Sequence, residues 1–147
     1  VSVEEYGPVA RAFHSGADVI QPVKAWGSVA SSMSTVMGTY HSLYALRKSN
    51  GLAVSLEDNQ EICRAQKDLA QKEGVFCESA SATTLAGLRR LRAEGAIKEG
   101  ERVVMLITAS GVKDTAVTAG YLGEIPEAGG DIRQVAQVLK DVYGVTV

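Results

Sequence analysis

The sequence predicts an α/β protein with a mostly parallel sheet and helices on both faces, and two observations indicate this class. Short apolar runs alternate with segments of helical periodicity along the chain, as in a series of strand–helix–strand crossovers. The run Val103–Ile107 is apolar at every position, which is typical of a central strand in a parallel sheet. The length of 147 residues suits a single domain with its own core.

The first strand and the first long helix are expected before residue 50. Residues 18–23 follow the break at Gly16 and are interpreted as a strand. Residues 27–48 are interpreted as a helix that bends at Gly38 and stops at Asn50-Gly51, where a left-handed backbone is tolerated. Their apolar side chains recur at spacings of three and four, which places them on one helical face: Ala30, Met33, Met37, Tyr40 and Tyr44.

The second strand and helix follow directly. Residues 52–56 are the strand, and Ser55-Leu56-Glu57-Asp58 has the pattern of a capped helix start, with acids where the helix dipole favours them. The helix should run to about Glu73 and end at Gly74. Its inward side chains are expected to be Ile62, Ala65, Leu69 and Ala70.

The remaining elements repeat the alternation. Residues 75–77 are expected to form a strand, followed by a helix that starts at Ser79 or Ser81 and stops at Gly95. Residues 102–108 are the strongest predicted strand, and residues 131–143 the last helix. The inward side chains of the helix before Gly95 are Leu85, Leu88 and Leu91.

Composition excludes several classes of function. A net charge of −2 and an aromatic content of 5% argue against a nucleic-acid partner, and no apolar run approaches the ~18 residues of a membrane span. Cys63 and Cys77 have no metal-ligand spacing with each other or with a histidine, so we expect no metal site. Two cysteines without a disulfide framework favour a reducing, cytoplasmic location.

Two polar segments lie where parallel strands should end, which is where ligands bind in open α/β sheets. They are Glu78 and the loop Thr108-Ala109-Ser110-Gly111. The loop's hydroxyls and amides suit an anion or a ring nitrogen, but they equally suit a helix cap, and Glu78 equally suits the start of a helix. Ser28 belongs to a serine cluster for which capping and ligand approach are both open.

Four stretches together resemble the C-terminal region of threonine synthases. They are Gly51–Asp58, Ala65–Ala70, Glu73–Gly87 and Leu106–Asp114. The most specific phrases are Glu78-Ser-Ala-Ser-Ala followed by Leu85-Ala-Gly, and Thr108-Ala-Ser-Gly-Val-Lys-Asp114. The resemblance covers about residues 8–120 and is weaker before Gly51.

The resemblance implies a pyridoxal phosphate enzyme with the fold of tryptophan synthase β chains, which converts O-phospho-L-homoserine and water to L-threonine and phosphate. It implies that Thr108 donates a hydrogen bond to the pyridine nitrogen and that Ser110, Glu78 and Ser28 lie near the cofactor. It also implies an amino-acid substrate, a homodimer, and a Schiff-base lysine in an N-terminal half that these residues, 1–147, do not include. This chain would then be the C-terminal part of a catalytic domain.

The chain departs from the family pattern at two places. Ser79 stands where the family has Pro, and Ala109-Ser110 stands where it has Gly-His or Gly-Asn. The second change removes a larger polar side chain beside the cofactor. A dehydratase-like relative acting on serine or threonine therefore remains an alternative, as does a non-catalytic α/β module.

Overall fold

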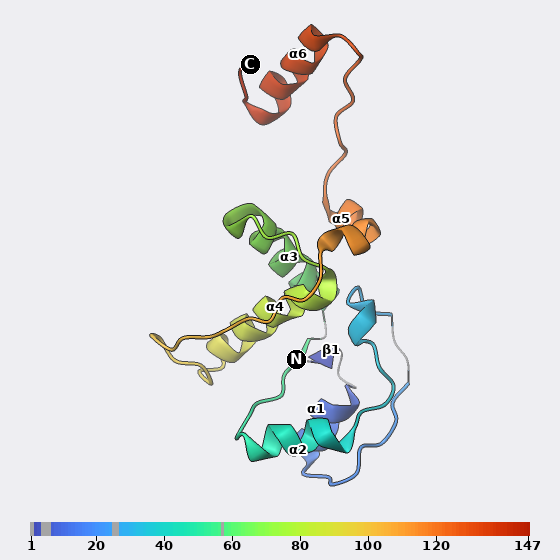
Figure 1. The fold of residues 1–147 in the computed structure, drawn as a ribbon, viewed down its shortest axis with the longest axis vertical. Coiled ribbons are helices and arrows are strands. Elements are labelled where there is room, and N and C mark those ends of the chain that lie inside the picture. Colours follow the sequence, from blue (N-terminus) through green and yellow to red (C-terminus); the bar gives the residue numbers. More distant parts are fainter. Residues whose placement is uncertain (1, 4–6, 25–26, 57) are drawn as a thin grey trace.

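The computed structural model describes residues 2–3, 7–24, 27–56 and 58–147. Its elements, in chain order, are β1 (Ser2–Val3), α1 (Pro8–Ser15), η1 (Ser31–Met33), α2 (Tyr40–Lys48), β2 (Ser55–Leu56), α3 (Asn59–Glu73), α4 (Ser79–Ala93), η2 (Gly111–Lys113), α5 (Thr115–Tyr121) and α6 (Ile132–Tyr143). Figure 1 shows α3 and α4 in the middle of the molecule, α1 and α2 together at one end, and α6 at the other.

The helix α3 begins and ends as the sequence predicts. The side chain of Asp58 accepts a hydrogen bond from the amide of Gln60, which satisfies one of the free donors at the helix start. Gly74 ends the helix in the left-handed conformation, with φ of 67°. Of the predicted capping sequence Ser55–Asp58, Asp58 is the cap, Ser55 and Leu56 form β2, and Glu57 lies outside the described residues.

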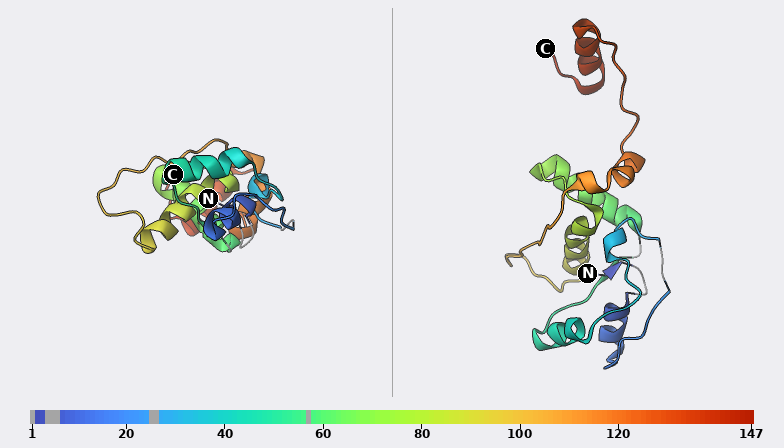
Figure 2. Two further views of the ribbon diagram at one scale, coloured as in Figure 1. Left: turned by 90° about the horizontal axis from the view of Figure 1, so that it is seen from below. Right: turned by 45° about the vertical axis from the view of Figure 1, so that its right-hand side comes forward.

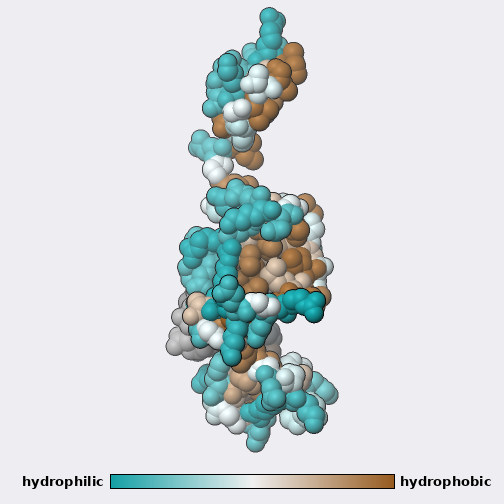
Figure 3. Space-filling view, turned by 90° about the vertical axis from the view of Figure 1, so that its left-hand side faces the viewer, coloured by the Kyte–Doolittle hydropathy of each residue, from teal (hydrophilic) through white to brown (hydrophobic). Residues whose placement is uncertain are grey.

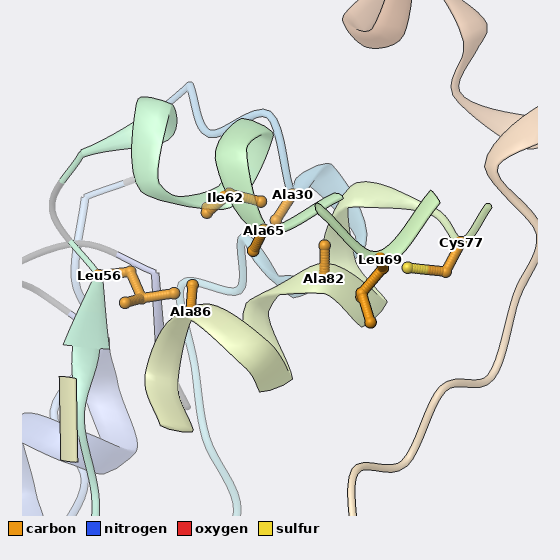
Figure 4. Close-up of a cluster of buried hydrophobic side chains, with 8 residues drawn as sticks. All are labelled: Ala30, Leu56, Ile62, Ala65, Leu69, Cys77, Ala82 and Ala86. Atoms are coloured by element: carbon orange, nitrogen blue, oxygen red, sulfur yellow. The ribbon is translucent and has the colours of Figure 1, made fainter. Parts of the chain in front are cut away.

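The core lies where α3 packs against α4. Ile62, Ala65 and Leu69 of α3 are buried as predicted, and they meet Ala82 and Ala86 of α4. Figure 4 shows these side chains together with the other buried members of the cluster, Ala30, Leu56 and Cys77. The small side chains of α4 form the contact, while Leu85, Leu88 and Leu91 are only half-buried. Alanines at the crossing allow the two helices to approach closely.

The broad parallel sheet is not formed by the described residues. β1 and β2 make one parallel pair, with Ser2 opposite Ser55 and Val3 opposite Leu56. Residues 18–23 contain no strand, so that prediction is wrong, and the strand predicted at 52–56 is confirmed only at Ser55–Leu56. At 75–77 only Cys77 pairs, in an antiparallel bridge with Ser110.

The strongest predicted strand, 102–108, has no regular secondary structure. It runs back along α4 toward α5 (Figure 1), and among the described residues no neighbouring strand accepts its backbone hydrogen bonds. Met105 and Ile107 pack against the core, whereas Val104 and Leu106 are 93% and 73% exposed. The segment is apolar on two sides, but only one of these sides has a partner within the described part of the chain.

The long helix predicted over 27–48 is present only as η1 and α2, so the prediction is wrong over much of its length. Thr39 has an extended backbone, and its hydroxyl accepts from the amide of Ser42, which starts α2 afresh. Gly38 lies against the side chains of Val9 and Ile20 and leaves no room for a Cβ. The apolar stripe instead ends on the surface, where Tyr40 is 64% exposed.

The predicted last helix is confirmed as α6, with Asp131 capping its start and Gly144 ending it. None of its residues is buried, and the right-hand view of Figure 2 shows it apart from the other helices. Figure 3 shows apolar surface along one side of this part of the molecule and on the middle of the same face. Apolar surface is therefore left open both at α6 and around the core.

Candidate functional site

The two polar segments singled out from the sequence lie side by side. The amide of Gly111 donates to the carbonyl of Phe76 at 3.0 Å, and the amide of Glu78 donates to the carbonyl of Ala109 at 3.1 Å. These bonds hold the start of α4 against the loop that follows residues 102–108 (Figure 1). Glu78, Thr108 and Ser110 are thereby brought into one neighbourhood, although no broad sheet of described residues arranges them.

Ser81, in the first turn of α4, fixes Thr108. The amide of Thr108 donates to Ser81 Oγ at 3.2 Å, and Ser81 Oγ lies 3.5 Å from Thr108 Oγ1. Ser81 is 4% exposed, whereas Thr108 lies on the surface. A buried serine thus holds Thr108 through its amide, while the residue as a whole is exposed.

The other end of the loop is tied to α4 by two adjacent pairs. Lys113 Nζ lies 3.2 Å from Glu78 Oε2, and the Glu78 side chain is only 13% exposed. Ser79 Oγ donates to Asp114 Oδ2 at 2.7 Å, and Ser79 is 1% exposed. Ser110 lies in the sequence between Thr108 and these two contacts. Its hydroxyl accepts from the amide of Val112 as the cap of η2.

The glycine of the loop is required by packing. A Cβ on Gly111 would lie 2.5 Å from ring atoms of Phe76, closer than real Cβ atoms approach. Gly111 is buried and its φ is not positive, so the need is for space and not for backbone freedom. Any side chain there would push the loop away from the start of α4.

A buried glutamine, which sequence reasoning missed, supports the loop from below. Gln66 of α3 is fully buried; its Nε2 donates to the carbonyl of Cys77 at 2.7 Å. Its Oε1 accepts from the hydroxyls of Tyr121 and Thr118, both in α5. The available signal was a polar residue at an inward position of α3, next to Ala65 and three positions before Leu69.

Burial governs the titrating groups beneath the loop. Burial raises the pKa of the Cys77 thiol, and the charge of the neighbouring Glu78 raises it further. Burial likewise raises the pKa of the Tyr121 hydroxyl. Both groups are therefore protonated near neutral pH, and neither is suited to act as a nucleophile or a base.

Ser28 is not brought to this loop by any contact between described residues. Its hydroxyl donates to Asn59 Oδ1 at 3.3 Å and accepts from the amide of Ala30 at 3.1 Å. The same Asn59 oxygen accepts from the amide of Val29. Ser28 therefore joins the segment before η1 to the first residue of α3, whose cap is Asp58.

The described part of the chain lacks two further features. Its residues contain no group of three or more His, Cys, Asp or Glu side chains arranged to hold a metal ion. Nor does any helix among them combine the length and apolarity needed to cross a membrane.

Residues 1–109 match the family model described as pyridoxal-phosphate dependent enzyme. The chain belongs to this family. The match includes Glu78, Ser81 and Thr108 and ends within the loop, at Ala109. The cofactor of the family is pyridoxal phosphate.

The chain is also similar to curated threonine synthases. It is 34% identical to that of Methanocaldococcus jannaschii over 137 residues, covering 92% of this chain and 34% of the relative. It is 39% identical to that of Methanosarcina acetivorans over 116 residues, covering 78% of this chain and 28% of the relative. The chain therefore spans about a third of the length of these relatives.

A solved structure shares the fold. The crystal structure of a T.th. threonine deaminase aligns with a TM-score of 0.51 at 16% sequence identity. The alignment covers 63% of this chain and 31% of that one. At this identity the likeness concerns the fold alone.

Proposed function

We propose that this chain is the cofactor-facing C-terminal part of a pyridoxal phosphate lyase that acts as a threonine synthase. The reaction would convert O-phospho-L-homoserine and water to L-threonine and phosphate. Family membership and the threonine synthase relatives support this proposal. The observation that carries it at the site is Thr108, an exposed residue whose amide is held by Ser81 Oγ.

The residues present fit the cofactor in chemical terms. A threonine hydroxyl is a neutral donor that can pair with a pyridine nitrogen without forcing a proton onto it. When bound, pyridoxal phosphate supplies an electron sink, and the protein supplies position and electrostatics. Thr108 would orient the ring, and a neutral partner at the nitrogen would moderate how strongly the ring withdraws electrons.

Glu78 and Ser110 would act from the same loop. Glu78 is largely buried, and Lys113 balances its charge, so it suits a fixed electrostatic role beside the cofactor. Ser110 offers a second hydroxyl next to the exposed face of Thr108. Ser28 would act from the start of α3, where Asn59 holds it.

The remaining parts of the site would come from elsewhere in a longer polypeptide. We propose that an N-terminal half provides the lysine that anchors the cofactor and the strands that flank residues 102–108. Exposed Val104 and Leu106 support this arrangement, because flanking strands would place residues 102–108 in a sheet, and helices on the face of that sheet would bury both side chains. The intact enzyme would act on a small amino acid, in the cytoplasm, as a homodimer.

The test is pyridoxal phosphate binding by the full-length protein that carries this chain. Replacing Thr108 with Val keeps the shape and removes the hydroxyl, and we expect roughly tenfold weaker binding, the effect of one lost hydrogen bond. Thr108→Ser should bind nearly as the parent does. Thr84→Val is the matched control, because the Thr84 hydroxyl bonds the carbonyl of Ser81 within its own helix.

Two outcomes would count against the proposal. Equal affinity of the parent and Thr108→Val would remove Thr108 from the cofactor site. The second test is borohydride reduction followed by peptide mass mapping. If no specific lysine adduct is found, the catalytic claim is wrong.

A dehydratase-like activity is the second candidate. Ala109 and Ser110 replace the bulkier polar pair of the threonine synthase pattern, and the structural relative is named a threonine deaminase. Product analysis separates the two activities. Threonine and phosphate from O-phospho-L-homoserine would support the synthase, and a keto acid from L-serine or L-threonine the dehydratase.

A further inference from the structure

We infer that Ser81 is a positioning residue that aims the Thr108 hydroxyl at the nitrogen of the cofactor ring. The inference rests on the proposed contact between Thr108 and the cofactor and adds the residue that makes this contact effective. Ser81 is itself too deeply buried, at 4% exposure, to touch a ligand on the outer side of the loop.

The firmer of the two contacts is to the backbone. Ser81 Oγ accepts the Thr108 amide hydrogen at 3.2 Å, which fixes the residue at the end of a segment that has no strand neighbours among the described residues. Ser81 is anchored in the first turn of α4, and α4 packs on α3 across the core. Through Ser81, the position of Thr108 is therefore fixed relative to the packed core between α3 and α4.

The second contact concerns the direction of the hydroxyl hydrogen. The two hydroxyl oxygens are 3.5 Å apart, at the outer limit of a hydrogen bond. Because Ser81 Oγ already accepts from the amide, its own hydrogen is free to point toward Thr108 Oγ1. With Ser81 as the donor of this pair, Thr108 Oγ1 directs its own hydrogen away from Ser81 and donates it more strongly.

The nearby serine Ser79 offers a matched comparison. It lies on the same turn of α4, is 1% exposed, and donates to Asp114 Oδ2 instead of contacting Thr108. Replacing either serine with alanine removes one buried hydroxyl from the same helical turn. Only the change at Ser81 alters the partner of Thr108.

The experiment is a double-mutant cycle in the full-length protein loaded with pyridoxal phosphate. The variants are Ser81→Ala, Thr108→Val and the double variant, and the readouts are the dissociation constant of the cofactor and its bound absorbance spectrum. We expect Ser81→Ala to weaken binding about threefold to tenfold when Thr108 is present, with a shift in the absorbance maximum. In the Thr108→Val background the same change should have an effect below about twofold, because no hydroxyl remains to be aimed.

The outcomes separate this inference from the proposed function. An effect of Ser81→Ala that is equal in both backgrounds, or that Ser79→Ala reproduces with the same dependence on Thr108, would overturn the positioning role and leave Thr108 as a cofactor contact. No effect of Thr108→Val would overturn the proposed contact itself, and the inference with it. If Ser81→Ala fails to fold, Ser81→Cys gives the same test, since it keeps the volume and is a poor acceptor.

Discussion

Gln66 is the single side chain on which the layout of the loop depends most. It is fully buried, and its amide joins α3 to two other segments, through the Cys77 carbonyl before α4 and through two hydroxyls of α5. A buried amide with all of these partners is satisfied, but loss of the side chain would leave the Cys77 carbonyl without a donor. The cost of such a change would come mainly from the groups left unpaired.

The two cysteines provide a direct test of the buried surroundings. Burial raises the pKa of both Cys63 and Cys77, and the nearby negative charges of Asp58 and Glu78 act in the same direction. Because the thiolate is the reactive form, we expect neither thiol to react with Ellman's reagent at about pH 8 until the chain is unfolded. In denaturant both should react.

An added surface cysteine, Gln71→Cys, is the control for this measurement, because Gln71 is exposed on α3. It should react within the native protein at the rate of a free thiol. Rapid reaction of two equivalents in the parent chain would show that the region around Cys77 is open.

At the scale of elements, the helices with clear end signals were predictable. Asp58, Gly74 and Asp131 mark helix ends by chemistry that acts within a few residues, and the structure has those ends. The predicted strands fared worse, because a strand needs a partner and the partners of residues 102–108 are not among the described residues. The helix expected over 27–48 failed because the Thr39 cap and the packing of Gly38 outweigh a periodic pattern.

The candidate site was likewise only partly predictable from the sequence. The adjacency of Glu78 and the loop was inferable, since both follow apolar runs that were expected to end at one edge of a sheet. The support from Ser81, Ser79 and Gln66 was not, because it depends on which hydroxyl or amide faces which loop atom. Side-chain pairing across 27 to 35 positions leaves no periodic trace in a sequence.

Glycines at a helix end and in a helix interior should respond oppositely to alanine. Gly74 has φ of 67°, which strains any side chain, so Gly74→Ala should destabilise the chain by about 1 kcal/mol. Gly120 lies within α5 with φ in the ordinary range, and no atom lies within 4 Å of the place a Cβ would take, so Gly120→Ala should stabilise by roughly 0.5–1 kcal/mol. Urea unfolding followed by circular dichroism measures both, and equal signs would contradict the assigned conformations.

For the whole molecule, the open apolar segment is the main determinant of behaviour in solution. Val104 and Leu106 are 93% and 73% exposed on a segment whose backbone lacks strand neighbours among the described residues. Surfaces of this kind pair with other chains when nothing covers them. We therefore expect residues 1–147, prepared alone, to self-associate in a concentration-dependent manner by sedimentation velocity.

The substitutions Val104→Glu and Leu106→Glu together should reduce that association, because they place charge on the open segment. Ile125→Glu is the control: Ile125 is 80% exposed but lies in the connection between α5 and α6. An unchanged sedimentation profile for the double variant would assign the association to another surface. Loss of association with Ile125→Glu alone would point to that connection instead.

Because the buried residues gather between α3 and α4, local opening of the backbone should differ along the chain. Amides in these two helices can exchange with deuterium only when the core opens, whereas α6, with no buried residue, can unwind without disturbing it. Exchange should therefore be slowest in residues 59–73 and 79–93 and fast beyond residue 122. The helices α3 and α4 would form a protected centre, and α6 would unfold and refold independently of them.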